Sequence, residues 1–151
     1  MKNKSANMEF TIVVDSRENH PYKFKGAVIK GLKSGDYSIL GLECRITIER
    51  KTKEDAYASL GVGRARFERE LKRLAEYDYS AIVIESNLDD FLKPPAYTEM
   101  NPKAAINSLV SWSVKYKVFI FFGSDRRHSQ ALVYRILEKY WKHRGNNVRE
   151  Q

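Results

Sequence analysis

Short apolar segments alternate with longer amphipathic ones along this chain of 151 residues. Strand-like runs occur at residues 9–14, 27–30, 36–39, 43–51, 81–84 and 118–122, and the last two are apolar throughout, which is typical of strands buried on both faces. Apolar residues at helical spacing predict helices over about 52–60, 64–77, 102–115 and 124–144, with a short helix or loop over 87–93. This alternation predicts an α/β domain with helices covering a central sheet.

Capping and breaking residues set the predicted helix boundaries. Thr52 suits the N-cap position of the helix predicted over about 52–60. Asp55 follows three residues later, where an acid complements the helix start. Gly61 and Gly63 interrupt the helical pattern and predict a turn between two helices. Ser124 is the predicted N-cap of the last helix.

The composition predicts one domain with its own core. Hydrophobic residues make up 42% of the chain and aromatic residues 12%, and a chain of this length buries about two thirds of its unfolded surface. We expect a disordered N-terminus over 1–8, a single domain over 9–144 and a flexible basic tail over 145–151. Lys and Arg outnumber Asp and Glu by 27 to 19, and the net charge of +8 favours a polyanionic partner.

Several classes of protein are disfavoured by the residues present. A single cysteine, Cys44, excludes an internal disulfide, and its apolar flanks predict a small buried side chain in a strand. The three histidines are too scattered for a structural zinc site. No apolar run reaches the roughly 18 residues of a membrane span, so we expect no membrane partner and a cytoplasmic location, or a nucleoid or nuclear one with DNA.

Candidate chemistry centres on Asp36 and on Glu49-Arg50-Lys51. If residues 43–51 form a strand, Glu49 and Lys51 face the same side. A strand, turn and strand would place Asp36 beside Glu49, and paired carboxylates bind hard cations such as Mg²⁺. An acid and a lysine at alternate strand positions more often form a solvated face, so these residues alone do not establish a site.

Further motifs favour a catalytic site over a solvated face. With them, the chain resembles the nuclease domain of the XPF-type structure-specific endonucleases, a branch of the PD-(D/E)xK restriction-like nucleases. The similarity covers roughly residues 9 to 137. Its motifs appear in the family's order as Asp15-Ser16-Arg17-Glu18, Gly35-Asp36, Glu49-Arg50-Lys51 followed by Asp55, Gly63 to Phe67 at a helix start, and Glu85 at a strand end.

The resemblance implies a restriction-endonuclease-like fold, with a central mixed β-sheet flanked by helices on both faces. It implies a metal-dependent endonuclease that hydrolyses DNA at branches, flaps or other single-strand/double-strand junctions in repair or recombination, with Mg²⁺ or Mn²⁺ as cofactor. The expected metal ligands are Asp36, Glu49 and Asp15, and Lys51 would position or activate the attacking water. The expected phosphate contacts are Arg17, Arg50, Arg64 and Arg66, and the expected supporting acids are Glu18, Asp55 and Glu85.

The resemblance also leaves alternatives. Where many members have Gln four residues after the helix arginine, this chain has Glu70 after Arg66. A non-catalytic DNA-binding subunit and a general DNA nuclease sharing the fold are both open. Family members pair through their C-terminal helices and a final strand, so we expect a homodimer or a protein partner. The aromatic side chains expected to serve either as dimer contacts or as core are Trp112, Tyr134, Tyr140 and Trp141.

Overall fold

A computed structural model describes residues 10–145 of the chain. The predicted N-terminal segment 1–8 and all but the first residue of the predicted tail lie outside the described residues. The strands are β1 (Ile12–Asp15), β2 (Val28–Lys30), β3 (Tyr37–Ile39), β4 (Ile46–Thr52), β5 (Tyr79–Glu85) and β6 (Phe119–Phe122). The helices are α1 (Lys53–Leu60), α2 (Arg64–Leu74), α3 (Leu88–Phe91), α4 (Pro102–Tyr116), α5 (Arg126–Tyr140) and the π-helical turn η1 (Trp141–Gly145).

The six strands form one mixed sheet in the order β2-β1-β3-β4-β5-β6. The strand β3 pairs in antiparallel fashion with β1 and β4, whereas β1–β2, β4–β5 and β5–β6 are parallel pairs. Both the α/β class and the mixed sheet predicted from sequence are confirmed.

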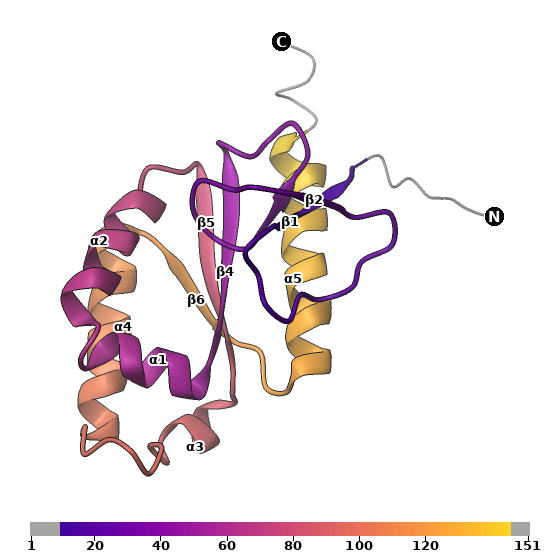
Figure 1. Ribbon diagram of the computed structural model, residues 1–151. Helices are drawn as coiled ribbons and strands as arrows, with labels where there is room; N and C mark the ends of the chain where they lie inside the picture. Colours follow the sequence, from indigo (N-terminus) through magenta and orange to yellow (C-terminus); the bar gives the residue numbers. More distant parts are fainter. Residues whose placement is uncertain (1–9, 146–151) are drawn as a thin grey trace.

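Helices cover both faces of this sheet (Figure 1), with α1, α2 and α4 on one side and α5 on the other. Each face has its own buried cluster. One cluster joins β1, β3 and β4 to α5 and includes Ile48, Val83 and Leu137. The other joins β5 to α1, α2 and α4 and includes Ile82 and Leu71. Neighbouring residues of one strand therefore serve opposite cores, as the alternation of side chains along a strand requires.

One of the two predicted N-caps is confirmed and the other is wrong. The Thr52 hydroxyl accepts a hydrogen bond from the Asp55 N–H at 3.0 Å, which confirms the predicted N-cap of α1. The predicted cap of α5 is wrong. Asp125 is the N-cap, and its carboxylate accepts from the His128 N–H at 2.8 Å. Ser124 has φ +69° and lies in the turn before the helix.

Two predictions of burial are also wrong. Cys44 lies exposed in the turn before β4, because this strand begins at Ile46 rather than at residue 43. The apolar strand β6 forms an edge of the sheet, and Phe119 at its start is 52% exposed. Among residues 10–145, no helix is long and apolar enough to cross a membrane.

Most of the aromatic side chains considered as dimer contacts belong to the core of the chain. Trp112 packs in the cluster on the α4 side, and Tyr140 and Trp141 pack in the cluster on the α5 side. All three are less than a tenth exposed. Ordinary packing within one copy therefore accounts for these three residues.

Candidate active site

Three acidic residues form a row across the neighbouring strands β1, β3 and β4. Tyr37 on β3 pairs with Ile48 on β4, so Asp36, one residue before, is opposite Glu49. Asp15 ends β1 beside them, and its N–H donates to the Asp36 carbonyl at 2.8 Å. Residues that are opposite each other on adjacent strands point to the same face. The structure thus brings together the three acids named from the sequence.

Gly35 allows Asp36 to approach β4 closely. Its φ of +80° lies in the left-handed region, and a Cβ atom there would be 1.9 Å from the Thr47 hydroxyl oxygen. Only glycine combines that backbone conformation with that space. The Asp36 N–H then donates to the Ile48 carbonyl at 2.8 Å, which fixes the register of the acidic row.

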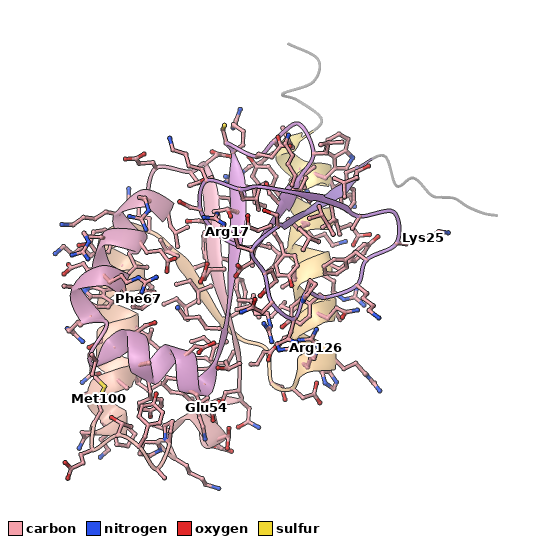
Figure 2. The ribbon with its side chains drawn as sticks, in the orientation of Figure 1. Arg17, Lys25, Glu54, Phe67, Met100 and Arg126 are labelled. Carbon is pink, nitrogen blue, oxygen red and sulfur yellow. The ribbon has the colours of Figure 1, made fainter. Side chains whose placement is uncertain are left out.

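The acidic row opens into a cleft of about 640 Å³ between the sheet and the helices α1 and α2. In Figure 2, Arg17 marks the side formed by the segment after β1, and Phe67 marks the side formed by α2. The acids along the cleft are Asp15, Asp36, Glu49, Asp55 and Glu70, and the basic side chains are Arg17, Lys33, Lys51, Arg66 and Arg73. Such a mixture suits a polyanion whose phosphates contact cations near a negatively charged floor.

The carboxyl groups of Asp36 and Glu49, on this floor of the cleft, have raised pKa values. Burial raises the pKa of Asp36 to about 7, opposed by a hydrogen bond from the Arg50 N–H and reinforced by nearby acids that include Glu70. Burial also raises the pKa of Glu49 well above its usual range, and the charges on Asp36 and Glu70 add to the rise, while Lys51 opposes it. Paired, desolvated carboxylates with raised pKa values are a common property of catalytic sites.

Asp15 is held differently from the other two acids. It is 5% exposed, and its Oδ1 accepts from the Leu32 N–H at 2.8 Å. Its Oδ2 accepts from the Arg17 Nε at 3.1 Å, and the same guanidinium donates to the Leu32 carbonyl at 2.5 Å. Both oxygens of Asp15 therefore accept hydrogen bonds. Arg17, predicted as a phosphate contact, lines the cleft and donates one of its hydrogen bonds to this acid.

Arg50 and Glu85 lie on the opposite face of the sheet from Glu49 and Lys51. The Arg50 Nε donates to Glu85 at 2.8 Å, and its Nη1 lies 3.5 Å from Glu18. The guanidinium also lies over the Tyr22 ring, 5.3 Å from its centre. Burial opposes ionisation of Glu85, but the hydrogen bonds from Arg50 and Tyr22 lower its pKa.

The predicted phosphate role of Arg50 therefore has no support in the arrangement of its side chain, which is only 13% exposed. The predicted supporting acids Glu18 and Glu85 belong to this ion-paired network, and the charge on Glu18 also helps to raise the pKa of Asp36, which burial raises most. The network lies beside the long segment that joins β1 to β2, since Tyr22 belongs to that segment.

Among the two predicted arginines of α2, the structure brings only Arg66 to the cleft. The Arg64 guanidinium lies over the Trp112 ring at 4.5 Å and donates to the Leu60 carbonyl and to Ser108, both at 3.1 Å. These contacts tie α2 to α1 and α4. Arg66 lines the cleft and has no hydrogen bond or ion pair within the described part of the chain.

Three charged cleft residues were not identified as site residues from the sequence. Lys33 and Arg73 line the cleft, and within residues 10–145 neither has an internal partner. Glu70 also lines it and acts on the pKa values of Asp36 and Glu49. The one signal in the sequence was Glu70 itself, which replaces the glutamine that many relatives of the resembled family carry. Asp55 is exposed at the cleft, where sequence reasoning had placed it.

The donor set fits a hard divalent cation at Asp36 and Glu49. One Asp36 oxygen accepts from the Arg50 N–H, and the other has no partner within the described residues. Glu49 Oε2 lies 3.8 Å from the Lys51 ammonium, an ion-pair distance rather than a hydrogen bond. Across residues 10–145, no group of three or more His, Cys, Asp or Glu side chains is placed to hold a metal ion. Asp15, the third predicted ligand, accepts hydrogen bonds at both of its oxygens, so its role as a metal ligand stays a prediction.

The mixed sheet, its helical layers and the cleft define a restriction-endonuclease-like α/β domain. The chain belongs to the ERCC4 domain family, whose model matches residues 14–136. The relationship to XPF-type nuclease domains predicted from the motifs is thereby confirmed. A comparison with curated protein sequences found no match.

Solved structures agree with this fold. XPF from Aeropyrum pernix superposes with a TM-score of 0.66 at 24% identity, over 93% of this chain and 69% of that chain. XPF from Aeropyrum pernix in complex with DNA superposes with a TM-score of 0.71 at 21% identity, over 89% of this chain and 66% of that chain. At these identities the likeness establishes the fold, and the chain spans about two thirds of the length of each relative.

Proposed function

We propose that this chain is a DNA endonuclease that hydrolyses phosphodiester bonds with the help of Mg²⁺ or Mn²⁺. The observation that carries the proposal is the position of Asp36 opposite Glu49, with Lys51 on the same face of β4 and inside the same cleft. The match to the ERCC4 domain family supports it. The relative solved in complex with DNA supports DNA as the substrate.

Asp36 and Glu49 are the proposed ligands of the metal ion. Burial raises the pKa values of both groups, and the neighbouring acids add to the rise, so a dication beside them would favour their ionised forms. A metal ion held there would lower the pKa of a bound water and offset charge on the phosphate. Asp15 would hold the segment after β1 in place through its bonds to Leu32 and Arg17.

Lys51 is the proposed partner of the attacking water. Its ammonium group lies in the cleft 3.8 Å from Glu49, so it can orient a water against the phosphate and offset charge that builds up on the phosphate oxygens. Arg66, Lys33 and Arg73 would contact backbone phosphates on either side, because they line the cleft and have no hydrogen bond or ion pair with other side chains among residues 10–145.

We propose branched or flapped DNA as the preferred substrate, in repair or recombination. The support is the family relationship. A strand that leaves a duplex at a junction can bend toward a concave site more easily than continuous duplex can, because unstacking there is already complete.

Cleavage of end-labelled splayed-arm, flap and plain duplex DNA tests the proposal, with Mg²⁺ or Mn²⁺ and with Glu49→Gln beside the unmodified protein. The variant keeps the shape of the side chain and removes its charge. Glu99→Gln is the matched control, since Glu99 is exposed and lies outside the cleft. We expect cuts near the branch that disappear in Glu49→Gln and persist in Glu99→Gln.

Two other outcomes would select the alternatives. Equal binding without cleavage by the unmodified protein and Glu49→Gln would indicate a non-catalytic DNA-binding subunit. Cleavage of plain duplex as fast as of flaps, still dependent on Glu49, would indicate a general nuclease. Full cleavage by Glu49→Gln or by Asp36→Asn would refute the assignment of the site.

A homodimer through the edge strand β6 is also proposed. The outer edge of β6 has no neighbouring strand in the described sheet. Beside it, a hollow of about 710 Å³ is lined mainly by apolar side chains of α4 and β6, among them Phe119, Val110 and Val114, which are 52%, 56% and 73% exposed. An exposed apolar edge of this kind is rarely left uncovered in solution, and a second copy would cover it with an identical surface.

A further inference from the structure

The Lys51 ammonium group is held by a hydroxyl, that of Ser59, which no sequence motif identified. Its Nζ donates to the Ser59 hydroxyl oxygen at 3.0 Å, the one hydrogen bond that Lys51 makes within residues 10–145 besides its backbone bonds in the sheet. It also lies 4.9 Å from the centre of the Phe67 ring. The strand β4, the helix α1 and the helix α2 thus each supply one neighbour of this ammonium: Glu49, Ser59 and Phe67.

The chain connectivity explains why Ser59 reaches Lys51. The helix α1 begins directly after β4, and the Thr52 N-cap fixes the direction in which the helix leaves the sheet. Ser59 lies near the end of this eight-residue helix, so the helix returns along the cleft beside the strand. Ser59 and Lys51 both line the cleft, and the Ser59 side chain is partly buried.

A lysine side chain has four rotatable bonds, so its ammonium group is poorly placed unless other groups restrain it. The ion-pair distance of 3.8 Å to Glu49 is too long to fix a direction. The Phe67 ring attracts a cation but allows it to slide over the ring face. The hydroxyl of Ser59 is the neighbour that restrains the direction of the Nζ atom.

We propose that Ser59 is a positioning residue of the active site, which holds the Lys51 ammonium group beside Glu49 at the place where the attacking water must be oriented. This inference rests on the proposed nuclease function. Ser59 does not touch the substrate in this role, and it acts through Lys51. Small displacements of a catalytic group can lower a rate by orders of magnitude.

Ser59→Ala tests the inference without threatening the fold. Alanine favours a helix more than serine does, and the removed hydroxyl makes no hydrogen bond to any described residue except Lys51. A lower rate in this variant therefore has its cause in the site. Ser111→Ala is the matched control, because Ser111 is an exposed helical serine on α4 outside the cleft.

The measurement is single-turnover cleavage of a flap substrate with saturating Mg²⁺ or Mn²⁺, together with the dissociation constant for the same DNA. We expect Ser59→Ala to cleave about 10-fold more slowly, with unchanged DNA binding and unchanged melting temperature. Ser59→Thr keeps a hydroxyl on the same carbon and should recover most of the rate. Ser111→Ala should cleave like the unmodified protein.

A double variant separates positioning from any independent effect of Ser59. In a Lys51→Ala background, Ser59→Ala should cause no further loss, because the group it positions is already absent. An equal loss in both backgrounds would overturn the inference. So would a normal rate in Ser59→Ala while Glu49→Gln is inactive, and that result would leave the proposed nuclease function intact. Normal cleavage by Glu49→Gln would overturn the proposed function as well.

Discussion

Replacing Asp36 by asparagine should stabilise the metal-free protein at neutral pH. Asp36→Asn keeps the shape of the side chain and removes the charge that the cleft disfavours. Burial raises the pKa of Asp36 to about 7, against an ordinary value of 3.8, and nearby acids including Glu70 add to the rise. The folded protein therefore holds a proton at Asp36 in a pH range where the unfolded chain has released it.

The sign of the effect follows from this difference in proton binding. Between about pH 4 and pH 7 the folded state binds more protons at Asp36 than the unfolded state does, so the free energy of unfolding falls as the pH rises. At about 1.4 kcal/mol per pKa unit, the shift from 3.8 to about 7 corresponds to about 4 kcal/mol. The cleft is open to water and salt, so we expect about half of this, or about 2 kcal/mol.

Urea unfolding in EDTA at pH 5 and at pH 8 measures the effect. Two of the pKa units by which Asp36 is shifted lie between pH 5 and its folded pKa of about 7, so the unmodified protein should lose about 1.4 kcal/mol more stability from pH 5 to pH 8 than Asp36→Asn, which lacks the titrating group. Glu99→Gln, which removes an exposed acid outside the cleft, should follow the unmodified protein. Added Mg²⁺ at pH 8 should raise the stability of the unmodified protein and leave that of Asp36→Asn nearly unchanged.

The reasoning would be refuted if Asp36→Asn were the less stable protein at pH 8 in EDTA. It would also be refuted if the two proteins lost stability in parallel as the pH rose. Either result would mean that the cleft already balances the charge of Asp36, and the case for a dication between Asp36 and Glu49 would lose its electrostatic basis.

Three further predictions concern the charged and apolar surfaces around the site. Arg50→Ala should lower the free energy of urea unfolding by about 3–5 kcal/mol, because it leaves Glu85 without its cation. Arg66→Ala and Arg73→Ala should each reduce the salt dependence of DNA binding, measured by fluorescence anisotropy, by about one unit of log K per log salt without changing stability. Phe119, 52% exposed, lies at the proposed dimer edge, so the unmodified protein should sediment as a dimer at micromolar concentration and Phe119→Asp as a monomer.

Local pattern was sufficient for most of the fold. Alternating and continuous apolar runs located every strand to within a few residues, and helical spacing located the longer helices. The position of a strand within the sheet was beyond such patterns. Residues 81–84 and 118–122 read alike as continuous apolar runs, yet β5 is central and β6 is an edge strand. Strand order depends on contacts between distant segments, and a single run of residues does not record them.

The same limit applies to the site. Asp36 and Glu49 followed from motif spacing and strand alternation, since both are local properties of a hairpin. Arg73 and Glu70 reached the cleft because α2 packs against this face of the sheet, and Lys33 reached it from the segment between β2 and β3. No spacing along the chain encodes that packing, so these residues appear only in three dimensions.

Strand alternation alone predicts the direction of the Arg50 side chain, whereas the family resemblance led us to expect a phosphate contact there. A residue between Glu49 and Lys51 on a strand must point away from the face those two share. The structure follows that rule, since the Arg50 guanidinium lies between Glu85 and Glu18 on the face covered by α5. The middle residue of the motif thus links the sheet to the segment after β1, to which Glu18 belongs.

The charged residues on the two faces of β4 therefore differ in how far ion pairs within the chain neutralise them. On the α5 face, Arg50 is paired with two acids, and both pairs are largely shielded from solvent. On the cleft face, the acids Asp36 and Glu49 have raised pKa values, and Arg66 has no hydrogen bond or ion pair in the part of the chain that the structure describes. This cleft holds unbalanced charges of both signs side by side. Such a cleft favours a ligand that carries both signs. A DNA phosphate together with a divalent cation meets that requirement, and neither component alone does.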